Sequence, residues 1–424
     1  MSEPFPARNE SLYSDIDLND EPACLQLAKE SESDDVVVVK NPEDSSVFRV
    51  QIVAFEKRGG FFDVHFVYKI ETEVSGVQGY SRSRYETWRR FTDFMDLHEK
   101  MVAKYRPRGV LIPQPPEKKV SVMAKAMTNT HTSQDPELLQ RARHLERFLN
   151  RLIQHPRIRC DCDVRDFLTM EADLPPMAKQ DVLSAVGVLR AFNGFKEAID
   201  KFTIAWEETD QWFEKSQAFY EELEASIRML YEHATALVSN RKEMAASGEM
   251  LAKSLSRLAA SEDSTTLSLA LTALTDTYEQ LAVIWSKQAV QHDTKFQESL
   301  DEYIGLIDSL RDVFDERIHV WQQLKKTQKT LEELKKRMET CDDARVEELN
   351  REIDEMERAR EQFGRHFDDI SMAIRDEVTR FENAREVDLK TLLVDFMEDM
   401  IRAHAVMSKL WEQFDPYAHK ILGN

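Results

Sequence analysis

WRRFTDF, residues 88–94, lies where the hydrophobic period of the chain changes. The residues before it, from Tyr80 to Trp88, have the composition of a strand, whereas apolar residues recur at helical spacing from Phe91 onward. Two earlier strand-like segments flank a glycine-containing turn at residues 57–60, which is a hairpin signal. We therefore predict a three-stranded antiparallel sheet that leads directly into a helix.

Downstream of this segment the chain alternates between proline-rich and helical sequence. IPQPPEKK, residues 112–119, is expected to be extended and stiff. A helix is predicted from Pro136 through Arg141 and beyond, and a last short helix from Asp163. We predict that residues 46–174 form one domain of the α+β class, a size that is usual for a single domain.

Long helices are predicted for the rest of the chain. Residues 204–424 contain a single proline, Pro416. Apolar residues recur at helical spacing over roughly 206–259, 265–339 and 344–415. A helix of about 70 residues is about 100 Å long, so the sequence predicts an elongated all-α bundle of three helices in coiled-coil packing, whose apolar stripe needs a partner.

Two further segments flank the domains. Residues 1–45 are acidic and serine-rich, and we expect a disordered tail whose partner the sequence does not identify. Residues 180–203 are amphipathic, with Leu189, Phe192 and Phe195 on one face. Insertion into a membrane and packing against the bundle are both compatible with this pattern, and the flanking cations favour the membrane.

The charge of the chain is unevenly distributed. The formal net charge is −21, but residues 1–47, 48–174 and 175–424 carry net charges of −9, +5 and −17. So acidic a chain lacks the cationic surface that nucleic acids require, and we expect no nucleic-acid partner. The basic middle segment is where an anionic ligand is expected.

Sequence features typical of catalysis are absent. No GxSxG, HExxH or Walker sequence occurs, so we expect no catalytic residues and no enzyme. One residue separates Cys160 from Cys162 and no second pair follows, so we expect ordinary thiols, no metal site and no cofactor. The few cysteines favour a cytoplasmic protein, and without an apolar run of about 18 residues any membrane contact is expected to be peripheral.

Cationic and aromatic side chains of the basic segment are expected to converge on one ligand. A phosphorylated inositol needs a guanidinium for bidentate contact with phosphate, an ammonium group and a flat ring against the sugar. Arg90 at a strand end, Lys118 after the prolines and Arg141 on the helix supply the cations, and Phe91 supplies the ring. The alternative is a set of unrelated surface charges, and the order and spacing of the motifs favour the shared site.

Residues 46–172 resemble the PX domain of the sorting nexins in three motifs: RRFTDF, PQPPEK and the RxxxLERFL helix. In that family the second arginine of the pair grips the 3-phosphate, the next aromatic residue stacks on the inositol, the lysine contacts the 1-phosphate and the helix arginine contacts ring hydroxyls. These positions are Arg90, Phe91, Lys118 and Arg141. The resemblance implies binding of phosphatidylinositol 3-phosphate, with the 3,5-bisphosphate as a second candidate. It also implies membrane insertion of the loop that carries Val120, Val122 and Met123.

The C-terminal half resembles a BAR domain that is joined to PX through an amphipathic helix, as in the sorting nexin-1 and sorting nexin-2 subgroup. The resemblance rests on residues 240–243, 252–255, 261–265 and 377–382. It implies a dimer that binds acidic membrane, stabilises tubules and works with the retromer cargo complex on the cytosolic face of early endosomes. A homodimer and a heterodimer with another PX-BAR sorting nexin remain equally open, as do the cargo, the lipid affinity and the curvature preference.

Basic residues cluster near the end of the second long helix: Lys325, Lys326, Lys329, Lys335, Lys336 and Arg337. Acidic lipid attracts such clusters by about 1 kcal/mol per charge near the surface. A solvated helix face that is balanced by neighbouring glutamates is an equally good interpretation.

Two functions follow from these features. The first is a coat subunit that binds phosphoinositide and remodels endosomal membrane as a BAR dimer in endosome-to-Golgi sorting. The second is a helical scaffold that dimerises with protein partners, in which the PX domain serves only for targeting. The complete set of four predicted lipid-binding residues favours the first.

Overall fold

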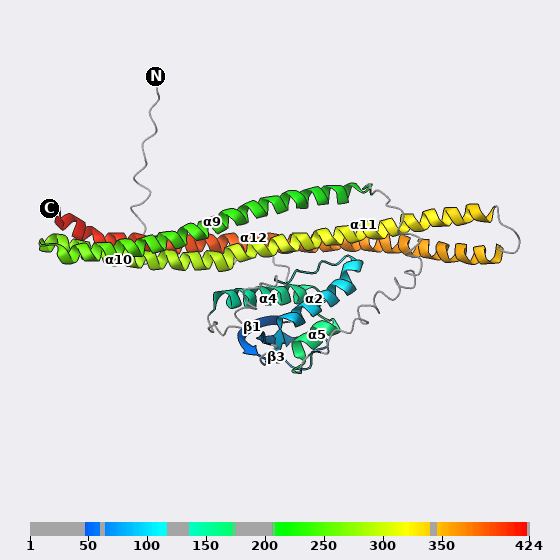
Figure 1. Cartoon of the computed structure of the whole chain (residues 1–424), viewed down its shortest axis with the longest axis horizontal. Coiled ribbons are helices and arrows are strands. Elements are labelled where there is room, and N and C mark those ends of the chain that lie inside the picture. The colour runs from blue at the N-terminus through cyan, green and yellow to red at the C-terminus, as the bar shows by residue number, and fades with distance from the viewer. Residues whose placement is uncertain are drawn as a thin grey trace, which may run out of the picture.

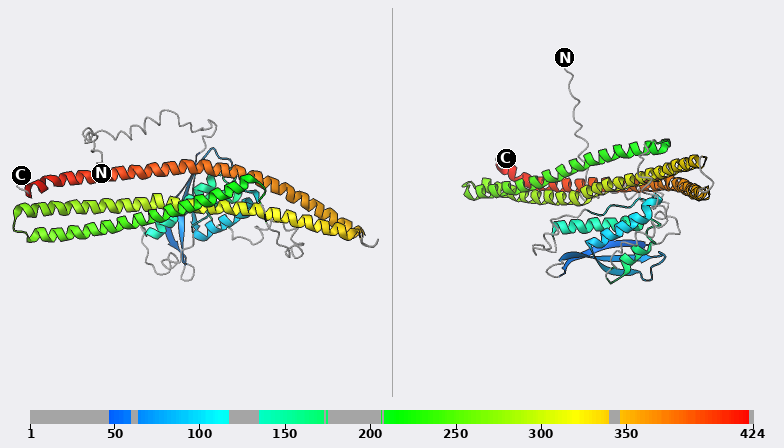
Figure 2. Two further views of the ribbon diagram at one scale, coloured as in Figure 1. Left: turned by 90° about the horizontal axis from the view of Figure 1, so that it is seen from above. Right: turned by 45° about the vertical axis from the view of Figure 1, so that its right-hand side comes forward.

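The structure, a computed structural model, places an α+β unit beside a long helical bundle (Figure 1). It describes residues 47–59, 64–116, 135–172, 174, 206, 208–339 and 346–421. The bundle is elongated, and the α+β unit lies against its middle rather than at either end (Figures 1 and 2).

The sheet has three antiparallel strands in the order β1-β2-β3, as the sequence predicts. Their bounds are β1 (Val47–Arg58), β2 (His65–Ser75) and β3 (Arg84–Arg90). Phe66, Tyr68 and Ile70, at every second position of β2, are buried in the core of the unit. β3 continues beyond Trp88 because Arg90 still pairs with Val67 of β2, so the strand delivers Arg90 directly to the next helix.

Helices pack on this sheet. They are α2 (Phe91–Tyr105), the 3₁₀ turn η2 (Arg106–Arg108), α4 (Pro136–Gln154) and α5 (Cys162–Thr169). α4 begins where the sequence predicts because the Asp135 carboxylate accepts from the backbone amides of Glu137 and Leu138, with proline at the first helical position.

α4 also covers the outer edge of β1. The Asn150 side chain accepts from the amide of Val50 at 3.2 Å and donates to its carbonyl at 2.8 Å. The Glu146 carboxylate accepts from the amide of Ile52 at 2.7 Å. These side chains take the place of a neighbouring strand and fix α4 firmly to the sheet.

His98, on α2, links the stability of this unit to pH. Its ring lies beside Phe148, and its Nε2 atom is buried without a hydrogen-bond partner among the described residues. Burial, and then the charge of Arg106, lower the pKa of His98 to about 4. The unfolded imidazole has a pKa near 6.5. Stability from this group is therefore complete above pH 6.5 and is lost as the pH falls towards 4.

We expect up to about 3 kcal/mol of this stability to be lost between pH 7.5 and pH 4.5. Thermal unfolding of the wild type and of His98→Phe across that range measures it. The variant should lose much less stability than the wild type, because it has no imidazole to protonate. An equal loss in both proteins would assign the effect to other groups.

Three long helical stretches form the bundle, as predicted. The first is α9 (Gln211–Ser261). The second is continuous and consists of α10 (Thr265–Gln291), the π-helical turn η4 (His292–Gln297) and α11 (Glu298–Met338). The third is α12 (Val346–Ile421). α9 begins at Gln211 because the Asp210 carboxylate accepts from the amide of Trp212. α12 continues beyond the expected end at residue 415, since Pro416 lies in its last turns, where one lost hydrogen bond is tolerated.

The bundle has one hairpin at each end. α9 and α10 pair at the end that also holds the C-terminus, whereas α11 and α12 pair at the opposite end (Figure 1). Gly248 allows α9 to approach α10 closely, because a β-carbon there would lie 2.9 Å from the Trp285 ring. None of the helices in the described residues is long and apolar enough to cross a membrane.

Candidate functional site

Arg90 stands at the junction of β3 and α2, with its side chain half exposed. The Asp93 carboxylate accepts from the backbone amide of Arg90 at 2.8 Å and from its Nε atom at 3.1 Å. Asp93 therefore orients the guanidinium through one edge and leaves the two terminal nitrogens without a bond to any described residue. A guanidinium held in this way presents the pair of donors that phosphate recognition uses.

Arg89 has the opposite environment and is 1% exposed. It donates to the carbonyls of Phe167 at 2.9 Å and Met170 at 2.5 Å, and its guanidinium lies over the Phe167 ring. These hydrogen bonds to the C-terminal end of α5 fix that helix to the sheet. The alternation of side chains along β3 thus sends Arg89 into the core and Arg90 to the surface.

Phe91 and Arg141 meet beside Arg90. The Arg141 guanidinium carbon lies 4.4 Å from the centre of the Phe91 ring, although one residue opens α2 and the other belongs to α4. Arg141 is 8% exposed. Its Nη2 atom is buried and has no hydrogen-bond partner within the described part of the chain. Buried donors are normally paired, so an orphaned guanidinium nitrogen fits a site for an anion or a hydroxyl-rich ligand.

Tyr68 belongs to the same place, and sequence reasoning did not single it out. Its hydroxyl is fully buried beside the Arg141 guanidinium. Burial raises the pKa of Tyr68, while the nearby Arg141 charge acts in the opposite direction. In the sequence Tyr68 reads as an ordinary core aromatic of a strand; only its interaction with Arg141 reveals its position.

The structure thus brings two predicted residues, Phe91 and Arg141, into contact and places Arg90 next to them. The other predicted contact residues of this region and of the amphipathic segment lie outside the described residues: Lys118, Val120, Val122, Met123, Leu189, Phe192 and Phe195.

The predicted basic cluster lies at the end of the bundle formed by the α11–α12 hairpin (Figure 1). Lys329, Lys335, Lys336 and Arg337 are exposed, and Lys325 and Lys326 are half-buried. Lys335 pairs with Glu357 of α12 at 2.7 Å, and the Lys325 ammonium lies over the Trp321 ring. Part of the cluster is therefore engaged within the bundle, and four of its six side chains are exposed.

An apolar stripe runs along the other half of the bundle. On α9, Leu230, Met244, Leu251 and Leu258 fall on one seven-residue series and are 44%, 44%, 42% and 52% exposed. On α12, Val387, Val394 and Ile401 repeat the spacing and are also exposed. Seven-residue apolar spacing is the pattern of helix–helix association, and so much exposed apolar surface indicates a protein partner.

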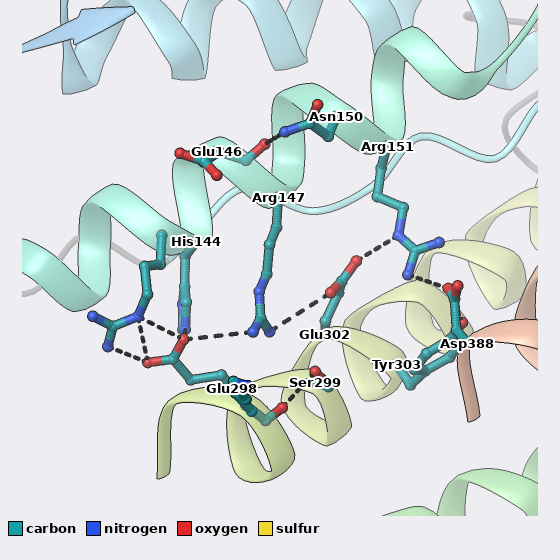
Figure 3. A network of polar contacts seen from close by, with 12 residues as sticks. His144, Glu146, Arg147, Asn150, Arg151, Glu298, Ser299, Glu302, Tyr303 and Asp388 are labelled. Carbon is teal, nitrogen blue, oxygen red and sulfur yellow. Dashed lines mark hydrogen bonds and ion pairs between the residues drawn. The ribbon is translucent and has the colours of Figure 1, made fainter. Parts of the chain in front are cut away.

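Arginines on one face of α4 fasten the α+β unit to the bundle (Figure 3). Arg143 pairs with the buried Glu298 of α11 at 2.5 Å. Arg151 pairs with Glu302 of α11 at 2.5 Å and with Asp388 of α12 at 2.6 Å. Three such residues at four-residue spacing, with Arg147 between the two, lie on one side of a helix.

The segment after α2 supplies a second attachment. Leu111 belongs to the core of the bundle, while its neighbours Val110 and Ile112 belong to the core of the α+β unit. Gly109 adopts φ = +72°, and a β-carbon there would lie 3.1 Å from Ile374 of α12. The chain therefore enters its proline-rich connector already docked on the bundle.

Comparison with known proteins agrees with both halves of the structure. Residues 77–171 match the family model described as PX domain, and residues 188–417 match the one described as Vps5 C terminal like. Sorting nexin-2 from Bos taurus is 35% identical over 392 residues, which cover 90% of this chain and 75% of the relative. Sorting nexin-1 from Rattus norvegicus is 35% identical over 386 residues, covering 89% and 73%.

A solved structure shares the fold. A chain from the cryo-EM structure of the SNX-BAR Mvp1 tetramer superimposes with a TM-score of 0.57 at 15% identity, covering 87% of this chain and 99% of that one. The relatives match this chain along most of its length, over both the PX unit and the long helices. The chain belongs to the sorting nexin family and is of the PX-BAR type.

Proposed function

We propose that this protein binds phosphatidylinositol 3-phosphate on the cytosolic face of early endosomes. As a BAR dimer it bends and tubulates that membrane in retromer-type endosome-to-Golgi sorting. Membrane binding and curvature are properties of the PX-BAR family; the lipid, the compartment and the retromer partner are our proposal. The protein acts by binding rather than by catalysis.

One observation carries the proposal: the Arg90 guanidinium keeps its terminal nitrogens free one residue before Phe91, whose ring lies 4.4 Å from the guanidinium carbon of Arg141. Arg90 takes the 3-phosphate, and Asp93 orients it. Arg141 contacts ring hydroxyls with its orphaned nitrogen, and Phe91 provides an aromatic surface beside the inositol. Lys118 takes the 1-phosphate, as its place in the PX motif implies.

The 3,5-bisphosphate is the second candidate ligand of the same site. We propose the domain bounds 46–174 for PX, 180–203 for an amphipathic helix and 204–424 for BAR, after an acidic tail over residues 1–45. Val120, Val122 and Met123, together with Leu189, Phe192 and Phe195, insert into the bilayer. The exposed lysines of α11 add attraction to acidic lipid.

Flotation with liposomes tests this function. We expect the protein to float with vesicles that contain phosphatidylinositol 3-phosphate, and less well with vesicles of equal charge that contain phosphatidylserine instead. Electron microscopy of the same samples should show tubules. Flotation without tubules would support the second candidate, a scaffold, which the apolar stripe on α9 also suits. Equal flotation with both lipids would contradict a specific lipid site.

A further inference from the structure

The second long helix of the bundle is interrupted in its middle. Residues 292–297, the turn η4, form a π-helical turn between α10 and α11. A π-turn bonds residue i to i+5 and so accommodates one residue more than an α-helix in the same place. Such turns are among the few identified causes of sharp helix bends. α10 and α11 run in different directions on either side of this turn (Figures 1 and 2).

A buried polar cluster holds η4 against the two other helices. His292 is 3% exposed, and its Nε2 atom lies 3.2 Å from the Asp399 carboxylate of α12. Arg241 of α9 donates to the Nδ1 atom of His292 at 2.7 Å. The same Arg241 nitrogen lies 3.3 Å from Nε2, and burial, followed by the Arg241 charge, lowers the pKa of His292, which favours the neutral ring.

Aromatic packing completes this inner side of the turn. The Phe396 ring of α12 lies 4.6 Å from the His292 ring and 4.7 Å from the Phe296 ring, measured between centres. His292 and Phe296 are the first and fifth residues of the π-turn, and both are buried. Both residues therefore face α12.

The PX unit contacts the same turn from the outer side of the bundle. A π-turn disrupts the regular ladder of helix hydrogen bonds, which leaves carbonyls in need of donors. Arg147 of α4 donates to the carbonyl of Thr294, inside the turn, at 3.0 Å. Arg143 pairs with Glu298, the first residue after it (Figure 3). Arg141, of the candidate lipid site, lies on the same helix.

We propose that η4 sets the bend of the bundle, and hence the diameter of the membrane tubule, and that the PX domain holds this joint through Arg147. His292, Asp399 and Arg241 fix the turn from the inside, and Arg147 fixes it from the outside. The helix α4, which carries Arg141, therefore also stabilises the bend. The membrane part of this inference rests on the proposed function; the bend of the free dimer does not.

Deletion of Thr294 tests the joint. Removing the additional residue lets α10 and α11 join as one α-helix, with His292 and Phe296 still on a common face because their spacing becomes three residues. We expect X-ray scattering from the free dimer to report a straighter particle, and tubules to widen on the order of 1.5-fold. Thr294→Ala keeps the backbone and its carbonyl, so this control should match the wild type.

Arg147→Ala tests the contact between α4 and η4. It also provides a second test of the inference if the deletion variant does not fold. We expect a smaller change in the same direction, with unchanged affinity for a soluble inositol 1,3-bisphosphate headgroup. Arg165→Ala removes a partly exposed arginine of α5 that pairs with Asp166 of the same helix, and should change nothing.

The outcomes separate this inference from the function on which it rests. If the wild type forms no tubules but Thr294 deletion straightens the dimer in solution, the proposed function fails while η4 remains the joint. If wild-type tubules form and both variants keep their diameter and solution shape, η4 does not set the bend. Narrower tubules would overturn the inference as well.

Discussion

Arg90→Ala should weaken binding to vesicles with phosphatidylinositol 3-phosphate on the order of 100-fold, because each hydrogen bond to a charged group contributes about 1.5–3 kcal/mol. The melting temperature should not change. Arg90 is half exposed, and among the described residues its side chain pairs with Asp93, three residues away. Ion pairs of this kind at a surface add little stability. Flotation and calorimetry of the same preparation measure the two quantities.

The neighbouring arginine provides the matched control. Arg89→Ala should reduce the stability of the PX unit by about 3–5 kcal/mol, since it leaves buried carbonyls of α5 without their donor. At a temperature where this variant is still folded, its lipid affinity should stay near that of the wild type. Arg90 would lose its assigned role if Arg90→Ala bound as the wild type does, or if Arg89→Ala lost binding while folded.

Much of the fold was predictable where one local signal decides it. α2 begins at Phe91 because the apolar spacing changes there, and α4 begins at Pro136 because an aspartate cap precedes a proline. The prolines likewise separate the PX unit from the long helices. These features depend on residues that are close in sequence, so no knowledge of the tertiary structure is needed.

Other features depend on contacts between distant residues. The π-turn η4 adds a single residue, which barely disturbs the apolar spacing of a long helix, so the sequence predicts one uninterrupted helix there. Arg143, Arg147 and Arg151 read as ordinary surface charges of α4, and their acidic partners lie about 150 residues further along the chain. Nothing in the local pattern pairs them.

The candidate site divides in the same way. Arg90 and Arg141 are recognisable from motifs, and the structure adds how they are held: one by Asp93, the other against Phe91. Tyr68 could not be found from the sequence, since an aromatic residue in a strand is normally part of the core. The roles of Lys118 and of the inserting residues stay predictions.

α9 shows how a helical pattern can combine two faces. The apolar residues at helical spacing within residues 206–259 include Ile227 and Ala234, which are buried, but also Phe219 and Leu230, which are 46% and 44% exposed. One face packs against the rest of the bundle, and the second face continues along the helix through Leu251. A helix that is apolar on two sides needs two partners, and no described residue covers the second side.

Leu251→Glu should therefore convert the dimer into monomers. A carboxylate in an apolar interface costs several kcal/mol, so the dissociation constant should rise about 1,000-fold. Sedimentation at micromolar concentration measures it. Ser256→Glu adds the same charge at an exposed position of α9 outside the seven-residue series and should stay dimeric.

The monomer should keep its affinity for the soluble inositol 1,3-bisphosphate headgroup, because the PX site lies in a separate core. It should form no tubules, since a single bundle presents no two-sided curved surface to the bilayer. If Leu251→Glu stays dimeric, the stripe on α9 is not the dimer interface. If it is monomeric and still forms tubules, curvature does not depend on the dimer, and the scaffold that bends the membrane must be sought in contacts between PX units.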